Sequence, residues 1–350
     1  MTFEPRRRRR LTAWLIVAAL AVVVIVVAAV FTLISRPPQY PAPPPGWSII
    51  RPPYMVLALA EQDDYIWAGS TCCLSLIDRR SGKLLALPDG DRPSMSYVSD
   101  LLVDSDGVLW IAHRTGLTRY DGGTWRTFTK ADGLLPGPVL AMFEDRDGAL
   151  WIGAESGVSR YDGASWHIFT TEDGLAVPSV NVIFQDRDGA FWFGSFSVNQ
   201  GGLSRYDGST WSTYTVKDGL SHNSVNGIIQ DRNGVLWFAT GYGTAGGASW
   251  FDGDTWGTLT RDDGLAGDKM RSVFEDEEGR LWFGSEYDGI AITDGTEWRI
   301  ITPWDGVAGW EAMDILQDSD GVMWLGTENG VSRIESIDIA SPVGNNTATP

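Results

Sequence analysis

The sequence predicts an all-β fold, a seven-bladed β-propeller, preceded by an N-terminal transmembrane helix. A motif with a tryptophan after an Asp-Gly turn recurs at regular intervals, and short β-type segments follow each copy, which predicts the propeller. An apolar run without charged side chains predicts the helix. In chain order we expect a cytoplasmic basic tail, a transmembrane signal-anchor helix, a proline-rich spacer, the propeller and a flexible tail, at residues 1–10, 11–35, 36–45, 46–338 and 339–350.

The apolar run begins directly after a basic cluster. It extends from Leu11 to Ile34 and, at 24 residues, would be about 36 Å long as a helix, enough for a hydrocarbon core of about 30 Å. Arg6 to Arg10 should stay in the cytoplasm, which places the rest of the chain in the periplasm or at the cell surface. A cleavable signal peptide is the alternative, but its apolar region would be only about 7 to 15 residues long.

The spacer reads "SRPPQYPAPPPG" and holds six prolines. Proline-rich chain is stiff and extended, at about 3.1 Å per residue. We therefore expect a single-pass membrane protein that holds its propeller away from the bilayer.

The recurring tryptophan defines seven units of about 41 to 45 residues. It occurs at Trp67, Trp110, Trp151, Trp192, Trp237, Trp282 and Trp324. The third unit shows four strand segments, "VLAMFED", "LWIGA", "GVSRYDG" and "SWHIFTT", separated by turns. Four short strands in each of seven units describe a β-propeller.

A second tryptophan marks the fourth strand of five units. It occurs at Trp125, Trp166, Trp211, Trp256 and Trp298, always 26 residues before the next unit's first tryptophan. The length variation of these units therefore lies between the second and third strands, where "SFSVNQGG" and "TGYGTAGG" are inserted. One set of loops is free to vary.

The two ends of the repeat region complement each other. Residues 46–52, "GWSIIRP", resemble "EWRIITP" at 297–303, which is a fourth-strand sequence, whereas the last unit lacks a marked fourth strand. We expect Trp47 to Arg51 to complete the seventh blade, because closure removes the exposed edges of an open array.

Charge limits the partners. The formal net charge is −18, and residues 37–350 hold 21 basic against 44 acidic side chains, a surface that repels nucleic acid. The two cysteines, Cys72 and Cys73, are adjacent in sequence. Because a bridge between neighbours departs from ordinary disulfide geometry, we expect two packed thiols, with a vicinal disulfide as the alternative.

The units "DRDGALWIGAESGVSRYDG" and "DRDGAFWFGS…GGLSRYDG" resemble the two-component regulator propeller repeat, over about residues 46–336. The resemblance implies the extracytoplasmic sensor region of hybrid histidine kinases. In those receptors a linking domain, a membrane span and a kinase follow the propeller, whereas here the apolar run precedes it. Any phosphorelay would therefore need a separate signalling protein.

Most repeated residues favour a structural interpretation. The "DSDG", "DRDG", "DRNG" and "DEEG" segments suit tight hairpins better than a calcium loop, whose later ligands are missing. The repeated tryptophans suit packing between blades, whereas Trp304 and Trp310 break the pattern and are candidates for exposure. Arg119, Arg160 and Arg205 are expected to pair with turn aspartates.

The sequence predicts ligand binding on the face that carries the variable loops and the loops entering each next blade. The candidate binding residues are His113, Arg114, Glu155, Asn199, Gln200, His222, Tyr242, Glu286, Tyr287, Trp310, Glu328 and Asn329. We expect a sensory or ligand-binding module for a small molecule, a glycan or a protein, with no metal, no cofactor, no nucleic acid and no catalytic residue. A cell-surface protein-interaction scaffold is the alternative.

An enzyme is the least favoured class. Streptogramin lyases also use a seven-bladed propeller and need a histidine and acids on one face, so His113 and His222 keep a propeller lyase or hydrolase open. A shared fold alone does not predict activity.

Overall fold

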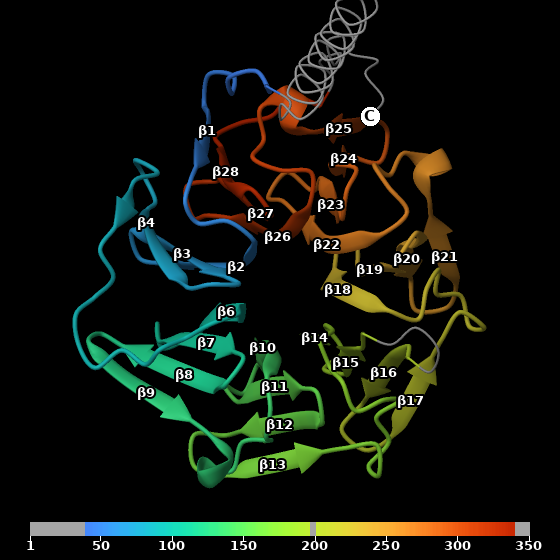
Figure 1. Cartoon of the computed structure of the whole chain (residues 1–350). Coiled ribbons are helices and arrows are strands. Elements are labelled where there is room, and N and C mark those ends of the chain that lie inside the picture. The colour runs from blue at the N-terminus through green and yellow to red at the C-terminus, as the bar shows by residue number, and fades with distance from the viewer. Residues whose placement is uncertain (1–38, 197–200, 340–350) are drawn as a thin grey trace, which may run out of the picture. The chain divides into compact units, whose positions relative to one another are not determined.

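The computed structural model of the chain describes residues 39–196 and 201–339. In these residues seven four-stranded antiparallel sheets are arranged as blades around a common centre (Figure 1). The predicted seven-bladed propeller is therefore confirmed. The predicted membrane helix lies outside the described residues, and no helix within them combines the length and the apolar character that a membrane crossing needs.

The strands of each blade follow one another in sequence, apart from the last blade. Blade 1 holds β2 (Val56–Gln62), β3 (Tyr65–Ser70), β4 (Leu74–Asp78) and β5 (Leu84–Leu85). Blade 2 holds β6 (Val98–Val103), β7 (Leu109–His113), β8 (Gly116–Asp121) and β9 (Thr124–Phe128). Blade 3 holds β10 (Val139–Glu144), β11 (Leu150–Ala154), β12 (Gly157–Tyr161) and β13 (Trp166–Phe169). Blade 4 holds β14 (Val182–Gln185), β15 (Phe191–Gly194), β16 (Leu203–Tyr206) and β17 (Trp211–Tyr214).

The remaining blades continue the pattern. Blade 5 holds β18 (Val225–Gln230), β19 (Leu236–Tyr242), β20 (Ala245–Phe251) and β21 (Trp256–Leu259). Blade 6 holds β22 (Met270–Glu275), β23 (Leu281–Ser285), β24 (Ile290–Thr293) and β25 (Trp298–Ile301). Blade 7 holds β26 (Ala312–Gln317), β27 (Met323–Thr327), β28 (Gly330–Ile334) and β1 (Trp47–Ile50). Short 3₁₀ turns occur at η1 (Lys130–Asp132), η2 (Arg261–Asp263) and η3 (Pro303–Asp305).

Blade 7 joins the two ends of the propeller sequence. Strand β1 pairs antiparallel with β28, with Trp47 opposite Ile334 and Ile50 opposite Val331. Figure 1 shows β1, coloured blue, beside the red β28. The Trp47 indole also donates to the Ser336 carbonyl oxygen at 3.0 Å. The predicted closing strand is therefore confirmed.

The first strand of each blade faces the centre. The inner strands contact one another in a closed sequence, from β2 through β6, β10, β14, β18, β22 and β26 back to β2. The hydrophobic core lies between neighbouring blades, as where Trp110 and Phe128 of blade 2 pack with Leu150 and Ile152 of blade 3. This order places the loops between second and third strands on one face, here called the variable face, and the Asp-Gly hairpins on the other, here called the turn face.

The repeated Asp-Gly turn is held by its first aspartate. In blade 3, Asp145 Oδ1 accepts from the backbone N–H groups of Asp147 at 3.0 Å and Ala149 at 2.8 Å. Its Oδ2 accepts from the Trp151 indole N–H at 2.8 Å. The same aspartate–indole bond recurs in the described residues of blades 2 and 4–7, at Asp104–Trp110, Asp186–Trp192, Asp231–Trp237, Asp276–Trp282 and Asp318–Trp324. The hairpin and packing interpretations of the motif are therefore confirmed.

The arginines of the third strands follow the expected pairing in two of three cases. Arg119 lies 2.9 Å from Asp121, and Arg160 lies 3.4 Å from Asp145. Arg205 instead places its guanidinium over the Trp192 ring, 5.6 Å from the ring centroid. A cation over an indole face is attracted by the ring's negative quadrupole.

The second tryptophan packs on the connection that enters its blade. In the connection from blade 2 to blade 3, Thr129 and Asp132 form a capping box, and Gly133 follows with φ +109°. A Cβ on Gly133 would lie 2.6 Å from Trp166 Cδ1. Glycine is required here both for its positive φ and for this close approach.

The cysteines differ from the expected thiols. Cys72 and Cys73 are joined in a vicinal disulfide between β3 and β4, so the two-thiol prediction was wrong. The loop is tight because the Ser70 N–H donates to the Cys73 carbonyl oxygen at 2.9 Å. Ser70 Oγ lies 3.2 Å from Cys72 Sγ and 3.6 Å from Cys73 Sγ, so both sulfur atoms are on the same side of the loop.

Candidate ligand-binding site

The centre of the propeller contains a channel lined by the inner strands. The register of six of these strands shifts by one residue near the start, as between Val98 and Asp100 in β6 and between Met270 and Ser272 in β22. A β-bulge of this kind re-aims a side chain. The residues within the shifts, including Ser99 and Arg271, line a cavity of about 260 Å³ in the channel.

The channel lining is polar on several sides. Asn226 Nδ2 donates to the carbonyl oxygens of Gly241 at 3.1 Å and Met270 at 2.8 Å. Asn181 Nδ2 donates to the Val225 carbonyl oxygen at 3.0 Å. Within the described residues, the buried Asn181 Oδ1 accepts no hydrogen bond. The channel therefore offers an acceptor that a bound donor could satisfy.

Two carboxyl groups lie deep in the channel. Asp100 Oδ2 accepts from the Met142 N–H at 2.6 Å, and Asp314 Oδ2 accepts from the Leu59 N–H at 2.7 Å, so each links its blade to the next. Burial raises the pKa of Asp100 to about 7 against the opposing effect of its backbone hydrogen bonds, and the nearby Asp314 raises it further. Burial likewise raises the pKa of Asp314 to about 6.

A charged cluster, here called the mouth cluster, lies where blades 6 and 7 meet the variable face. It consists of Lys269, Arg271, Glu286 and Glu311. Lys269 Nζ pairs with Glu286, and Arg271 Nε lies 3.2 Å from Glu286 Oε2 and 2.7 Å from Glu311 Oε1. The two glutamate side chains are each only 8% exposed. Two cations therefore balance two nearly buried carboxylates.

Burial also changes how the mouth cluster ionises. Desolvation, and then the neighbouring Arg271, lower the pKa of Lys269 to about 8. Desolvation raises the pKa of Glu311, although Arg271 opposes this shift. Both shifts have the sign expected when charged groups leave water.

Aromatic side chains border the mouth cluster. The Lys269 ammonium lies over the Tyr242 ring, 5.5 Å from its centroid, and Phe196 meets Tyr242 edge to face at 6.3 Å. Tyr242 is 48% exposed and Tyr287 is 69% exposed. These rings are the accessible apolar surface beside the cluster.

The structure brings together part of the predicted binding set. Tyr242 and Glu286 meet through Lys269. Glu328 Oε1 accepts from the Trp310 N–H at 2.9 Å. Asn329 contributes its carbonyl oxygen to the Arg51 guanidinium. These contacts link successive loops of the variable face.

Other predicted residues are placed differently. Arg114 and Glu155 are exposed on the loops of blades 2 and 3, and His222 Nδ1 accepts from the Ser224 N–H at 2.9 Å. Burial, and then Lys269, lower the pKa of His222. Asn199 and Gln200 lie outside the described residues. A binding role for these residues stays a prediction.

His113 was predicted to contact a ligand, but its side chain is buried. It is 1% exposed, its Nε2 lies 2.9 Å from Thr118 Oγ1, and its Nδ1 lies 3.0 Å from Thr115 Oγ1. Burial lowers its pKa to about 4. The side chain thus serves the interior of blade 2.

Several residues of the site were missed from the sequence. Lys269, Arg271 and Glu311 of the mouth cluster, and Asp100 and Asp314 of the channel, lie at or near the starts of inner strands. The signal was a charged residue in a position where most units have an apolar or small one. Only the bulges reveal that this position faces the channel.

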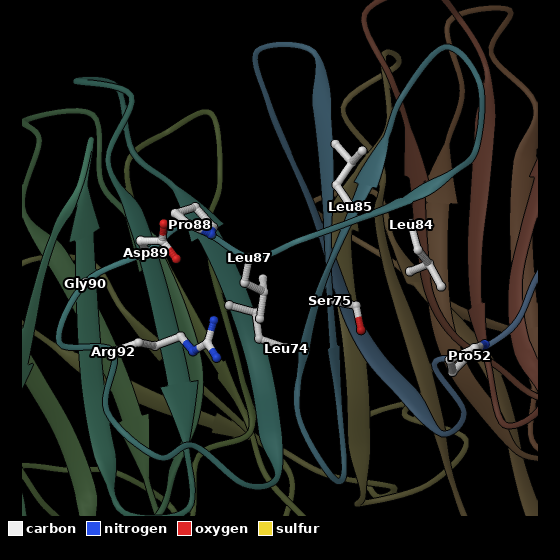
Figure 2. Close-up of a pocket in the computed structure, with 10 residues that line it drawn as sticks. All are labelled: Pro52, Leu74, Ser75, Leu84, Leu85, Leu87, Pro88, Asp89, Gly90 and Arg92. Carbon is white, nitrogen blue, oxygen red and sulfur yellow. The ribbon is translucent and has the colours of Figure 1, made fainter.

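A larger cavity than that of the channel lies elsewhere, on the rim of blade 1. It has a volume of about 520 Å³ and is lined by Leu74, Leu84 and Leu87 together with Asp89 and Arg92 (Figure 2). None of the predicted binding residues lines it. We therefore place the candidate site at the channel mouth, where polar groups converge.

Solved structures share the fold. The chain has a TM-score of 0.74 and 20% identity to the extracellular domain of a B. thetaiotaomicron protein assigned to a hybrid two component system, covering 88% of this chain and 46% of that one. For virginiamycin B lyase from Staphylococcus aureus the TM-score is 0.62 and the identity 16%, covering 83% of this chain and 98% of the lyase. For YCF48 bound to D1 peptide the TM-score is 0.61 and the identity 15%, covering 85% of this chain and 100% of YCF48. At these identities the likeness concerns the fold.

The sequence comparisons identify the repeat. No curated protein sequence matches the chain. The family model described as two component regulator propeller matches residues 133–156, 219–242, 264–287 and 311–329. These segments contain the first two strands of blades 3, 5, 6 and 7. Four of the seven blades thus match the two-component regulator propeller repeat.

Proposed function

We propose that the propeller is an extracytoplasmic sensory module that binds a small polar ligand at the mouth of its channel. The observation that carries the proposal is the mouth cluster, in which Lys269 and Arg271 pair with two nearly buried glutamates beside the exposed Tyr242. These residues differ from unit to unit, unlike the turn and core residues that build the blades. Polar groups on loops held by a rigid scaffold are the usual arrangement for recognition.

The mouth cluster favours a neutral, hydroxyl-rich ligand such as a glycan. Its charges are already balanced, so a strongly charged ligand would leave one partner of an ion pair uncompensated. A ligand with hydroxyl groups can bond to the carboxylates and the guanidinium while the pairs stay formed. The Tyr242 ring supplies a face on which an apolar side of such a ligand can rest.

Two observations support the extracytoplasmic location of the propeller, one from the sequence and one from a solved structure with a similar fold. The apolar run at residues 11–34 follows five arginines, which supports an anchor with the propeller outside. A solved neighbour of this fold is an extracellular domain. A separate signalling protein would receive the signal. Protease added to spheroplasts should remove the propeller, and full protection would contradict this topology.

Binding can be tested with the propeller alone. We would screen residues 41–339 against glycans and small polar compounds by thermal shift and confirm hits by calorimetry. Tyr242→Ala should weaken binding of a hit about tenfold, a loss of roughly 1.4 kcal/mol, and leave the melting temperature nearly unchanged because the ring is half exposed. Asp188→Ala on the turn face is the control. Equal losses in both variants would place the site elsewhere.

A protein-binding scaffold is the second candidate, and one observation favours it. Tyr54 (52% exposed), Met55 (39%) and Tyr97 (44%) lie on the variable face of blade 1 around the exposed Cys72. Backbone bonds link Met55 and Tyr97 to Thr71, so they form one patch. A fold neighbour was solved with a bound peptide. Glycan-independent capture of a protein that Tyr97→Ser abolishes would support this candidate over the first.

A lyase activity has less support. One fold neighbour is virginiamycin B lyase, but His113 is buried and bonded to two threonines. A base that must reach a substrate needs hydrogen-bond access to it. Turnover of a streptogramin by the propeller would revive this candidate.

A further inference from the structure

The blades are joined on the turn face by a repeated hydrogen bond. The second residue of the Asp-Gly turn donates its backbone N–H to the side chain that ends the inner strand of the next blade. The donor and acceptor pairs are Ser105–Glu144, Arg146–Gln185, Arg187–Gln230, Arg232–Glu275, Glu277–Gln317 and Ser319–Glu61, with distances from 2.7 to 3.2 Å. Where blades 1 and 2 meet, Gln62 Nε2 donates to the Gly107 carbonyl oxygen at 2.7 Å instead.

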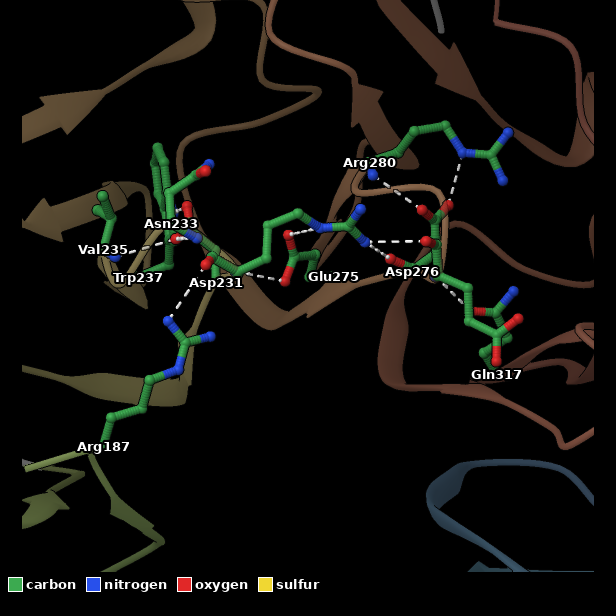
Figure 3. Close-up of polar contacts among 11 residues, drawn as sticks. Arg187, Asp231, Asn233, Val235, Trp237, Glu275, Asp276, Arg280 and Gln317 are labelled. Atoms are coloured by element: carbon green, nitrogen blue, oxygen red, sulfur yellow. Dashed lines mark hydrogen bonds and ion pairs between the residues drawn. The ribbon is translucent and has the colours of Figure 1, made fainter. Parts of the chain in front are cut away.

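In three of these interfaces an arginine side chain adds further bonds. Arg146 Nη1 donates to the Arg187 carbonyl oxygen at 2.9 Å, and Arg232 Nη2 donates to those of Asp276 at 2.8 Å and Glu277 at 2.9 Å. Figure 3 shows the turns of blades 5 and 6, with Arg187 reaching the turn of Asp231. The guanidinium occupies the groove between the two turns.

In two of these interfaces the arginine lies close to the glycine of the receiving turn. A Cβ on Gly279 would lie 2.7 Å from Arg232 Cζ, and one on Gly234 would lie 3.7 Å from Arg187 Nη1. A Cβ on Gly148, the matching glycine of blade 3, would meet only Glu144 Oε1, at 4.0 Å. Ser105 occupies the arginine position of this interface, so the turn of blade 2 supplies no guanidinium to the groove between blades 2 and 3.

The interface between blades 7 and 1 shows how a serine at this position is compensated. Ser319 replaces the arginine and bonds Glu61 through its hydroxyl at 2.6 Å. The nearly buried Arg79, from the end of the third strand of blade 1, lies 2.8 Å from Asp320 Oδ2, 3.4 Å from Glu61 Oε1 and 3.8 Å from Asp318 Oδ1. With Asp64, whose Oδ1 lies 4.0 Å from Arg79 Nη2, four carboxylates thus surround one guanidinium.

The interface between blades 2 and 3 holds counterparts of three of these carboxylates, Asp104, Asp106 and Glu144, without the arginine. Ser105 bonds Glu144 through its hydroxyl at 2.6 Å, as Ser319 bonds Glu61. Leu76 of blade 1 lies opposite Trp67, and Arg160 of blade 3 lies opposite Trp151, so the two residues are equivalent. Arg79 follows Leu76 by three residues, and the residue three after Arg160 is Gly163. A Cβ on Gly163 would meet nothing within 4 Å.

A cavity occupies the corresponding space. It has a volume of about 330 Å³, and its lining includes Asp104, Asp106, Glu144, Gly148 and Gly163. The three carboxylates are the counterparts of Glu61, Asp318 and Asp320, which lie around Arg79 between blades 7 and 1. The cavity therefore repeats these carboxylates, with Arg119 and Arg126 in its wall but no arginine at the position of Arg79.

The cations in the cavity wall are engaged elsewhere. Arg119 lies 2.9 Å from Asp121, and Arg126 lies 3.5 Å from Asp132. The Arg126 guanidinium also lies over the Phe128 ring, 4.3 Å from its centroid. Within the described residues none of the three carboxylates of the cavity pairs with a cation, since Glu144 accepts only from Ser105 and Asp104 from its own turn and Trp110. A planar guanidinium suits bidentate bonding to such carboxylates.

We propose that the cavity between blades 2 and 3 binds the guanidinium group of an arginine side chain on a partner protein. The arginine would pair with Glu144 and Asp106, as Arg79 pairs with Glu61 and Asp320 where blades 7 and 1 meet. This site lies on the turn face, opposite the proposed channel-mouth site, and does not depend on it.

The test uses a capped tripeptide Gly-Arg-Gly, with the neutral isostere Gly-citrulline-Gly as its control. Binding to residues 41–339 would be measured by NMR chemical-shift perturbation of the Ser105 and Gly163 amides. We expect the arginine peptide to bind at least about tenfold more tightly than the citrulline peptide, because bonds to charged groups are the stronger ones. Equal binding of both peptides would overturn the proposal.

Substitutions that copy the residue found at the same position in another blade should keep the fold intact. Glu144→Gln copies the Gln185 position and Asp106→Asn copies Asn233, so each removes a charge in a side chain that other blades tolerate. Each should weaken the arginine peptide about tenfold. Asp147→Asn, at the matching position of blade 3, where Arg146 already occupies the interface, should change nothing.

Ser105→Arg provides the decisive variant. It restores the residue type of Arg146, Arg187 and Arg232, so it should fill the groove, raise the melting temperature and abolish peptide binding. Peptide binding that survives in a folded Ser105→Arg variant would overturn the site. Binding of free arginine without binding of the capped tripeptide would overturn the partner protein as its source.

Discussion

At the residue scale, the two aspartates of each Asp-Gly turn have different roles that the sequence does not separate. Asp145 is buried and its carboxylate accepts from two backbone N–H groups, the Trp151 indole and Arg160, whereas Asp147 is exposed and donates its backbone N–H to Asp145. Stability should therefore depend on the first aspartate. The stabilising role thus belongs to the first aspartate of the "DRDG" segment and not to the segment as a whole.

Asp145→Ala should lower the free energy of unfolding by about 3 kcal/mol. The substitution leaves the buried Trp151 indole N–H and the Ala149 N–H without their acceptor, and each unsatisfied buried donor costs about 1–3 kcal/mol. Asp147→Ala should cost less than about 0.5 kcal/mol, as is usual for an exposed position. Urea unfolding of both variants checks this, and equal losses would contradict the division of roles.

Asp100 should make stability depend on pH. Its pKa is raised from 3.8 to about 7 in the folded chain, so between these values the folded state holds a proton that the unfolded state releases. The contribution of this carboxyl to stability therefore falls as pH rises from about 4 to about 7. Buried His113, whose pKa is lowered to about 4, contributes the opposite slope between about 4 and 6.5, so the wild-type curve alone is not diagnostic.

Asp100→Ala isolates this effect, since Ala58 and Ala141 occupy the same position in blades 1 and 3. The stability of the variant relative to wild type should increase as pH rises from 5 to about 7 and level off above that. Urea unfolding at pH 5, 6, 7 and 8 measures the difference. A constant difference over this range would show that the folded pKa is not raised.

At the element scale, β1 decides whether the propeller is closed. It adds the fourth strand to blade 7 and buries Ile50 to 7% exposure. The chain before it also contributes, because Pro43 lies against Gly306 and the Trp47 N–H donates to the Pro44 carbonyl oxygen at 3.0 Å. The end of the proline-rich spacer is therefore part of the propeller unit.

Truncation should reveal the closing strand. A chain of residues 53–339 exposes the edge of β28 and should aggregate or melt far below the chain of residues 41–339, because an unpaired edge recruits other strands. Light scattering and thermal melting compare the two. Similar behaviour of both chains would show that β1 is dispensable for closure.

The blades were predictable from the sequence because their residues repeat. The Trp spacing, the Asp-Gly turns and the strand at Trp47 each depend on local patterns that recur or complement one another. The candidate site was only partly predictable because it depends on departures from the repeat. Tyr242 and Glu286 lie on loops and were found, whereas Lys269 and Arg271 lie at inner strands where only the ring arrangement shows what they face.

At the scale of the whole molecule, the turn-face bonds connect every pair of neighbouring blades in the described residues, including the pair joined by β1. The recurring acceptor is a glutamate or glutamine directly before the first aspartate of the turn, such as Gln185 or Glu275. This residue was visible in the sequence, but its partner lies about 40 residues away in another blade. A ring of this kind has no terminal repeat at which unfolding can begin.

The propeller should therefore unfold as one unit. An open repeat array loses its end repeats first, because each repeat contacts only its neighbours. Here opening any interface leaves two blade faces exposed, so fluorescence from the tryptophans and far-UV circular dichroism should report the same urea midpoint. Glu275→Ala removes the acceptor of the Arg232 N–H and its guanidinium, and should lower both midpoints together by about 1–3 kcal/mol in free energy. Glu275→Gln, which copies Gln230, should recover most of that loss. If the two probes separate in the wild-type chain, or if Glu275→Ala shifts only one of them, the blades unfold singly and the ring does not couple them.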